Sequence, residues 1–300
     1  MQRLGKLGAQ VIIPFRGDPN EYRHLKLMGD VGQIVPVEFN PRDSESIQAA
    51  VEHSNAVVNL IGRHYATKNY TLEEANTAIP ADIAAQSKKA GVQRLLHVSA
   101  IGARTDAPGP YLQAKYQGEL AVREAFGKEA IIVRPTVLFG AEDAFLNRYA
   151  RFFRNMPVVP IFEGEHSKHA PVYSVDVARG IVNAVSNPDF EGMTFELEGP
   201  ETFTMQELLD CVRIVLKSDR QAVHVPPIVT NVAAMINERL PTHPMVTRDL
   251  ALRRNENRVA GASGESHPGF DALGVAPTPV QAVALSFLRR YRQAQVLYDL

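Results

Sequence analysis

The sequence predicts an α/β fold in which helices cover both faces of a doubly wound parallel sheet. Up to about residue 140, short apolar runs alternate with stretches of helical periodicity, which is typical of βαβ units. The connections between the runs are short, so consecutive strands should be neighbours joined by right-handed crossovers. The rest of the chain shows mainly helical patterns and few strand signals. These two observations together define the fold class.

The first half reads as five buried strands separated by helices. Continuous apolar runs are typical of parallel strands that are covered on both faces. The predicted strands are residues 11–15, 34–39, 56–61, 95–98 and 131–133, and the predicted helices are residues 21–28, 44–53, 72–90 and 111–126. Residues 1–7 suggest the end of an earlier helix, with Gly8 as its left-handed stop.

The second half reads as a smaller, mainly helical part with one or two strands that complete the sheet. We therefore divide the chain into an N-terminal sheet domain, residues 1–140, and a C-terminal part, residues 141–300. The predicted helices there are residues 142–155, 174–185, 205–217, 228–239, 246–255 and 278–293, and the predicted strands are residues 194–198 and 222–225.

Composition narrows the class of protein. The chain has 300 residues, 45% of them hydrophobic, and a formal net charge of −1, so no global positive field favours nucleic acid. Cys211 is the only cysteine, which excludes an internal disulfide and a cysteine-cluster zinc site. No apolar stretch approaches the roughly 20 residues of a membrane span. Nine histidines show no metal-ligand spacing, and we expect His166 and His169 to lie on a loop surface.

Ligands of a doubly wound sheet bind beyond the carboxyl ends of its strands, so the residues after each run matter most. Arg16 follows the first run, where an arginine would pair with a 2′-phosphate and favour NADP, although a solvated strand-end arginine is the alternative and Asp18 weakens the case. Asn40 could meet the adenine edge, while Asp43 is more simply a helix cap. The third run ends in Asn59, Leu60, Ile61 and Gly62, where a glycine allows close approach to a ligand or merely forms a turn.

The fourth and fifth runs are followed by side chains with catalytic chemistry. Ser99 and Ala100 precede a Y-x-x-x-K motif, in which Tyr111 and Lys115 share one helix face. The Lys115 ammonium would favour the tyrosinate form of Tyr111 and could hold the nicotinamide ribose hydroxyls. Ser99 could hydrogen-bond a substrate carbonyl. The motif is weak alone and gains weight from its place after a fourth strand. After the fifth run, Pro135, Thr136 and Val137 would lie over a nicotinamide.

Together these residues resemble the atypical branch of the short-chain dehydrogenase/reductase superfamily. Within it, segments such as "NLIGRHYATKNY", "AGVQRLLHVSA" and "LGVAPTPVQAVALSFLRRYR" are similar to the alpha-subcomplex subunit 9 family of mitochondrial respiratory complex I, the NADH dehydrogenase (ubiquinone) of electron transport. The resemblance implies a Rossmann-like NAD(P)-binding domain and a tightly held, structural NADPH that is not turned over. It also implies an accessory subunit on the matrix side of the inner membrane, where the hydrophilic and membrane arms meet near the quinone site. Its partners would be membrane-arm and quinone-site subunits, with lipid headgroups as a further possibility and no nucleic acid.

The sequence departs from this family at its start. Family members begin with a strand and a G-x-x-G-x-x-G turn that meets the pyrophosphate, and this sequence begins after them. In the strand order 3-2-1-4-5-6 the first strand lies between the second and the fourth. Each buried unpaired backbone group costs about 1–3 kcal/mol against a total stability of about 5–15 kcal/mol. We therefore expect upstream residues that supply the strand, or a replacement strand from elsewhere.

Two further functions remain open on the sequence. A free NADP-dependent reductase or epimerase would use Tyr111 and Lys115, and a nucleotide-sensing regulator would bind without reaction. The Y-x-x-x-K pair does not separate an accessory subunit from an enzyme, whereas the family resemblance favours the accessory subunit.

Overall fold

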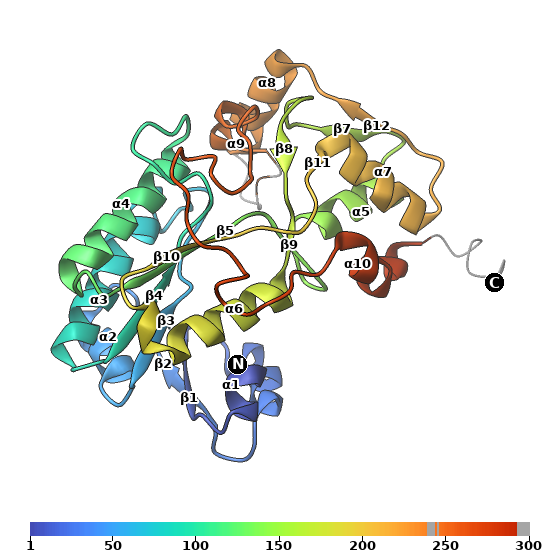
Figure 1. Ribbon diagram of the computed structural model, residues 1–300. Coiled ribbons are helices and arrows are strands. Elements are labelled where there is room, and N and C mark those ends of the chain that lie inside the picture. Colours follow the sequence, from blue (N-terminus) through green and yellow to red (C-terminus); the bar gives the residue numbers. More distant parts are fainter. Residues whose placement is uncertain (239–243, 245, 293–300) are drawn as a thin grey trace. The chain divides into compact units, whose positions relative to one another are not determined.

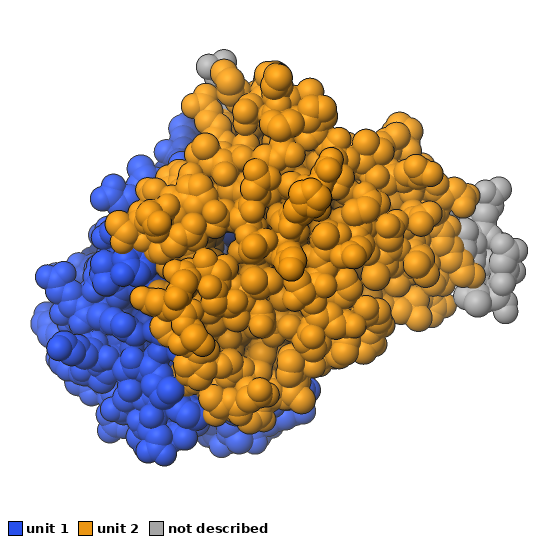
Figure 2. All heavy atoms as spheres, turned by 45° about the horizontal axis from the view of Figure 1, so that its top comes forward, with its two compact units in different colours: residues 1–99, 114–133, 179–194 blue, residues 100–113, 134–178, 195–300 orange. Residues whose placement is uncertain are grey.

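The computed structural model describes residues 1–238, 244 and 246–292 (Figure 1). The chain forms two compact units that interleave along the sequence (Figure 2). Unit 1 comprises residues 1–99, 114–133 and 179–194, and unit 2 comprises residues 100–113, 134–178 and 195–300. Because the units interleave, the division at residue 140 stays a prediction.

The first two strands of unit 1 form a parallel pair. Strand β1 (Val11–Phe15) pairs with β2 (Ile34–Glu38), and the register sets Phe15 opposite Glu38. The segment that joins them holds two 3₁₀ turns, Pro19–Glu21 and Arg23–Met28, where the sequence predicts one helix. The short helix α1 (Gln2–Lys6) comes before β1, and Gly8 follows it with φ +79°, as its stop role requires.

Four strands form the larger sheet, in the order β10-β5-β4-β3. Its pairs β3–β4 and β4–β5 are parallel, which confirms the predicted doubly wound arrangement. Strand β10 lies at the outer edge, so a C-terminal strand completes the sheet as predicted. The strands are β3 (Ala56–Asn59), β4 (Arg94–Val98), β5 (Ile131–Pro135) and β10 (Thr194–Leu197).

Among the described residues, β1 and β3 are end strands of two different sheets. Strand β1 is only partly buried along its length, with Pro14 exposed, and Ala56 of β3 is exposed as well. A continuous doubly wound sheet would have one more strand between the second and fourth strands of the fold. The presence of such a strand upstream of this sequence stays a prediction.

Helices of unit 1 bury the sheet through an apolar cluster. Isoleucines 47, 79 and 83, with Phe126, are at most 5% exposed and belong to this cluster. The predicted helix 72–90 is one continuous element that includes a π-helical segment, Glu74–Ala78, in its first turns. The helices are α2 (Ser44–Val51), α3 (Ile79–Lys89), α4 (Pro110–Ala125) and α6 (Ser174–Ser186), and α4 and α6 extend into unit 2.

Unit 2 has its own core, built on α5 (Leu146–Asn155) and α7 (Met205–Leu216). Tyr149 and Phe153 of α5 are at most 2% exposed in this core, as are Leu208 and Leu209 of α7. The other helices are α8 (Pro227–Asn237), α9 (Arg248–Leu252) and α10 (Val280–Leu288), with 3₁₀ turns at Pro188–Phe190 of unit 1 and Arg289–Tyr291.

Of the short strands in unit 2, the sequence predicts β12 (Ala222–His224), as residues 222–225, and the others were missed. Their lengths of two or three residues leave no periodicity to detect. The pairs are β7 (Val159–Ile161) with β12 (Ala222–His224), β8 (Lys168–His169) with β11 (Phe203–Thr204), and β6 (Leu138–Phe139) with β9 (Val172–Tyr173). Strand β12 therefore pairs with β7 and does not join the larger sheet.

Several helix boundaries differ from the prediction. Helix α5 begins at Leu146 because Asp143 folds the preceding residues into a turn, accepting hydrogen bonds from the amides of Phe145 and Asn147. Helices α9 and α10 are shorter than predicted, and residues 239 and 293 of the predicted helices lie outside the described residues. Within the described residues, no helix combines the length and apolarity needed to span a membrane.

His169 corrects one expectation. It lies in β8 and is 0% exposed, with Nε2 3.1 Å from the Ser167 hydroxyl, whereas His166 is exposed as predicted. Burial lowers the pKa of His169 to about 3, so the ring is neutral and is tolerated inside the protein. A histidine in a charged loop gives no sequence signal for this placement.

Candidate functional site

Arg16 stands at a hollow of about 540 Å³ in unit 1, at the carboxyl end of β1. We refer to it as the Arg16 hollow. The parallel register of β1 and β2 brings Arg16 and the residues after β2 to the same end of the pair. Its volume is within the range of small-ligand sites. The hollow is lined by Arg16, Glu38, Phe39, Asn40, Asp43 and Ser46.

The wall of the Arg16 hollow is fixed by the turn that begins α2. The amide of Asn40 donates to the Ser46 hydroxyl at 2.9 Å, and the Asn40 side-chain oxygen accepts from the amide of Arg42 at 3.1 Å. Asp43 accepts from the amide of Glu45, so it caps α2 as the sequence suggests. Asn40 lines the Arg16 hollow, and its contact with an adenine edge stays a prediction.

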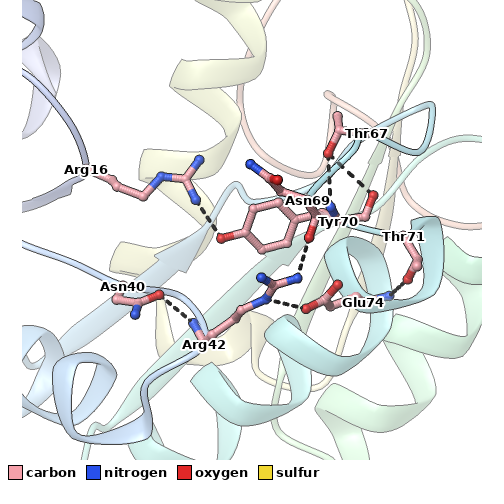
Figure 3. A network of polar contacts seen from close by, with 8 residues as sticks. All are labelled: Arg16, Asn40, Arg42, Thr67, Asn69, Tyr70, Thr71 and Glu74. Carbon is pink, nitrogen blue, oxygen red and sulfur yellow. Dashed lines mark hydrogen bonds and ion pairs between the residues drawn. The ribbon is translucent and has the colours of Figure 1, made fainter.

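A polar network extends from Arg16 across to the segment before the π-helical turn (Figure 3). Arg16 donates from Nη1 to the Tyr70 hydroxyl at 2.5 Å. The guanidinium of Arg42 lies over the same ring, 4.4 Å from its centroid. Arg42 also donates from Nε to Glu74 at 2.6 Å and from Nη2 to the carbonyl of Asn69. The sequence analysis assigned no role to Tyr70, Arg42 or Glu74.

A second cluster in unit 1 gathers at the carboxyl ends of β3 and β4. Asn59 is 3% exposed, and its side-chain oxygen accepts from the amide of Ile61 at 3.0 Å. Its Nδ2 lies 3.2 Å from Nδ1 of the buried His97. A Cβ built on Gly62 would stand 2.5 Å from the Lys115 ammonium and 2.9 Å from the Asn76 side-chain oxygen. A larger residue at this position would therefore displace the Lys115 or Asn76 side chain. Leu60, two residues earlier, is 66% exposed.

Lys115 reaches this cluster from α4. Its side chain is 5% exposed, and Nζ donates to the carbonyl of Val98 at 3.0 Å. Burial lowers the pKa of Lys115 to about 8, although nearby Glu119 raises it. Burial and the Lys115 charge together lower the pKa of His97 to about 3. A buried cation with two further donors beyond the Val98 bond suits a diol or another polar ligand group.

Ser99 adds an oriented hydroxyl at the end of β4. The residue is 5% exposed, and its Oγ is fully buried without a hydrogen-bond partner in the described structure. Its amide donates to the carbonyl of Val133 at 2.8 Å, which fixes the backbone. A buried hydroxyl without a partner in the described structure keeps both its donor and its acceptor available to a ligand or to water.

In unit 2, Tyr111 lies one helical turn before Lys115 on α4. Its amide donates to Oδ1 of Asp249 at 2.9 Å, and the Arg253 guanidinium lies 5.0 Å from its ring centroid. Asp249 and Arg253 form an ion pair at 2.6 Å, and their side chains are 5% and 11% exposed. Burial, reinforced by the Asp249 charge, raises the pKa of Tyr111, against an opposing effect of Arg253.

The residues after β5 also lie in unit 2. Thr136 is 6% exposed, and its hydroxyl donates to the carbonyl of Ala170 at 2.5 Å. Pro135 is buried, and Val137 is partly buried. Ala100, which follows β4, is partly buried as well. The hydroxyl of Thr136 is therefore engaged inside the protein, which the sequence did not foresee.

The structure thus brings the predicted residues into local groups. Arg16 and Asn40 share the Arg16 hollow, and Asn59, Ile61, Gly62 and Lys115 form the second cluster. Glu38 and Phe39 were missed as lining residues, although they end the predicted strand 34–39 directly before Asn40. Within the described residues, no group of three or more metal-ligating side chains occurs.

A family model described as NAD(P)H-binding matches residues 18–188. Curated proteins are similar over nearly the whole chain. The alpha subcomplex subunit 9 of mitochondrial NADH dehydrogenase (ubiquinone) from Rattus norvegicus is 38% identical over 294 residues, covering 97% of this chain and 76% of the relative. The protein of that name from Arabidopsis thaliana is 37% identical over 303 residues, covering 98% and 74%. The mitochondrial NADH-ubiquinone oxidoreductase 40 kDa subunit of Neurospora crassa is 33% identical, covering 100% and 77%.

Solved structures of similar fold include proteins in complex with a nucleotide sugar and NAD. MoeE5, solved with UDP-glucose and NAD, has a TM-score of 0.67 at 14% identity and covers 96% of this chain and 93% of its own. UDP-glucuronic acid 4-epimerase from Bacillus cereus also has a TM-score of 0.67, at 12% identity, covering 90% and 85%. At such identities the likeness establishes the Rossmann-like fold alone.

Proposed function

Because this chain belongs to the alpha subcomplex subunit 9 family of mitochondrial NADH dehydrogenase (ubiquinone), we propose that it is an accessory subunit of respiratory complex I that holds NADPH as a structural group. The observation that carries the proposal is identity of 33–39% with curated members over at least 97% of the chain. The fold alone would not fix the function, so the proposal rests on this family membership.

The residues of unit 1 fit the adenosine half of a dinucleotide. The Arg16 hollow offers a guanidinium at the strand end that meets the ribose in this fold, and Asn40 and Phe39 can meet the adenine. Arg16 supports NADP, whereas the exposed Glu38 in the same hollow is the kind of carboxylate that accepts a ribose 2′-hydroxyl from NAD. We take Arg16 as the deciding side chain because a phosphate gains charge-assisted hydrogen bonds from it.

The second cluster, at the ends of β3 and β4, fits the nicotinamide half of the dinucleotide. Lys115 would hold ribose hydroxyls with its free donors, and the orphaned Ser99 hydroxyl would meet the carboxamide side of the ligand. When bound, the nicotinamide supplies hydride chemistry. Burial raises the pKa of the chain's own Tyr111 despite the opposing charge of Arg253, which disfavours the tyrosinate that a general base would need. This supports a ribose-anchoring role for Tyr111 and Lys115, without turnover.

An exposed apolar face supports assembly with other chains. Helix α8 directs its small residues Thr230 and Ala234 inward at 0% exposure, while its large apolar residues face outward. Contiguous exposed apolar surfaces mark interaction sites. The outward residues are Ile228, Val229, Val232, Met235 and Ile236, each 44–77% exposed. We propose that such surfaces meet complex I subunits at the junction of the two arms, near the quinone site on the matrix side of the inner membrane.

The mass of the native particle tests the assembly. Gently solubilised mitochondria should release this chain in a membrane complex of many subunits, detected by native electrophoresis and immunoblotting. A chain that runs only as a monomer or small oligomer, and that consumes NADPH with a carbonyl substrate, would instead support the free reductase or epimerase. Loss of that consumption in Tyr111→Phe would identify the Y-x-x-x-K pair as its catalytic group.

A further inference from the structure

Arg16 is not free to sample all its rotamers, because Tyr70 holds it. The Tyr70 hydroxyl accepts from Nη1 at 2.5 Å, and the Arg16 guanidinium carbon lies 5.3 Å from the ring centroid (Figure 3). A guanidinium has five N–H donors. The contact with Tyr70 uses one of them, and Nε and Nη2 remain for a ligand in the Arg16 hollow, which Arg16 lines.

Tyr70 is itself fixed from three sides. Its ring packs against the apolar cluster of unit 1. Its amide donates to the Thr67 hydroxyl at 3.0 Å, and its carbonyl accepts from the Thr67 amide at 2.8 Å, which closes a tight turn. On the ring face lies the Arg42 guanidinium, 4.4 Å from the centroid. An exposed side chain such as Arg16 is thereby tied to a rigid part of the protein.

Arg42 already donates hydrogen bonds within the protein, so we do not expect it to contact the ligand directly. Its Nε is paired with Glu74 at 2.6 Å, and its Nη2 donates to the Asn69 carbonyl. The hydrogen bond that Arg42 donates to Glu74 raises the pKa of Arg42 above its usual value. A phosphate near Arg42 would also meet the Glu74 carboxylate. Arg42 therefore acts on the hollow through Tyr70, whose ring it covers.

We propose that Tyr70 is a specificity-determining positioning residue, which holds the Arg16 guanidinium ready for the 2′-phosphate of the dinucleotide. This proposal rests on the proposed function, since it concerns the same nucleotide site. Arginine has one of the largest side-chain entropies to lose when a ligand orders it. Because Tyr70 already restricts Arg16, ordering this side chain costs less free energy when a ligand binds. Only the ligand with a 2′-phosphate contacts Arg16, so only its affinity increases.

The test compares two probes that differ by the 2′-phosphate alone, adenosine 2′,5′-bisphosphate and adenosine 5′-monophosphate. Their dissociation constants are measured by calorimetry on the full chain and on Tyr70→Phe, which removes one hydroxyl and keeps the ring. Tyr291→Phe, far from the hollow in sequence and in the other unit, is the matched control. The preference ratio is the dissociation constant of the monophosphate divided by that of the bisphosphate. Immobilising one side chain costs about 0.5–1.5 kcal/mol, so this ratio should fall by about two- to tenfold in Tyr70→Phe.

A second variant separates positioning from a simple lost contact. Arg42→Met frees the Tyr70 turn without touching Arg16 or the Tyr70 hydroxyl, and it should lower the same ratio while leaving adenosine 5′-monophosphate binding unchanged. An unchanged or increased ratio in both folded variants, beside a wild-type preference for the bisphosphate, would overturn the role of Tyr70 alone. A wild-type protein without that preference would overturn the NADP assignment and the positioning role together.

Discussion

Replacing Asp249 by alanine should lower the free energy of unfolding by about 3–5 kcal/mol, the usual loss when one partner of a buried ion pair is removed. The Asp249 side chain is 5% exposed and bonds the Arg253 Nε at 2.6 Å. It also accepts a hydrogen bond of 2.9 Å from the backbone amide of Tyr111, in the first turn of α4. Asp249→Ala leaves a buried guanidinium and a helix-end amide without their partner. Urea unfolding followed by circular dichroism measures the loss.

Asp210→Ala is the matched control for this experiment. Asp210 also pairs with an arginine of its own helix, Arg213, at 3.2 Å, but the two side chains are 43% and 38% exposed. Exposed pairs contribute about 0–1 kcal/mol, so this control should change little. Equal losses in the two variants would contradict the view that the α9 segment stabilises the Tyr111 end of α4.

Replacing Arg16 by alanine should reduce the preference for a 2′-phosphate by roughly one to two decades. Hydrogen bonds that involve a charged group contribute about 1.5–3 kcal/mol each, and 1.4 kcal/mol is a factor of ten in affinity. Arg16 is exposed, which screens its charge, so the effect depends on direct contact with the phosphate. The affinity of the full chain for NADP(H) and NAD(H) is measured by calorimetry, and NAD(H) binding should change much less.

Arg23→Ala controls for the loss of one positive charge near the same strand. Arg23 is also exposed and lies in the 3₁₀ turn after β1, outside the Arg16 hollow. Because bound nucleotide stabilises the folded state by mass action, Arg16→Ala should also lose the thermal stabilisation that NADP(H) gives. NADP(H) retained undiminished in Arg16→Ala, or lost equally in Arg23→Ala, would show that Arg16 does not select the nucleotide.

The strands of the sheet were predictable because their signal is local. Runs such as residues 11–15 and 131–133 are apolar throughout, and a strand covered on both faces needs only that pattern. Ser99 and Asn59 could be named for the same reason, since they stand at the ends of such runs, whereas Lys115 was named from its Y-x-x-x-K spacing with Tyr111 on α4. Ligand positions at strand ends follow from topology, which the alternation of elements already fixes.

The contacts that complete the site depend on residues far apart in sequence. Tyr70 meets Arg16 over 54 positions, and Asp249 meets Tyr111 over 138 positions, so no spacing rule links them. Burial of His169 and of the Thr136 hydroxyl is likewise set by tertiary packing. The two-residue strands of unit 2 are too short for any period to appear. Sequence patterns therefore located the strand ends, and the structure was needed to show which side chains meet there.

The identity of the nucleotide held by the assembled protein tests the account most directly. The complex that contains this chain is purified without added nucleotide and denatured, and the released nucleotides are separated by chromatography against NADP(H) and NAD(H) standards. The account predicts NADP(H), equimolar with this chain and not consumed on incubation of the intact complex with NADPH. Release of NAD(H) at full occupancy, or of no nicotinamide dinucleotide at all, would contradict it.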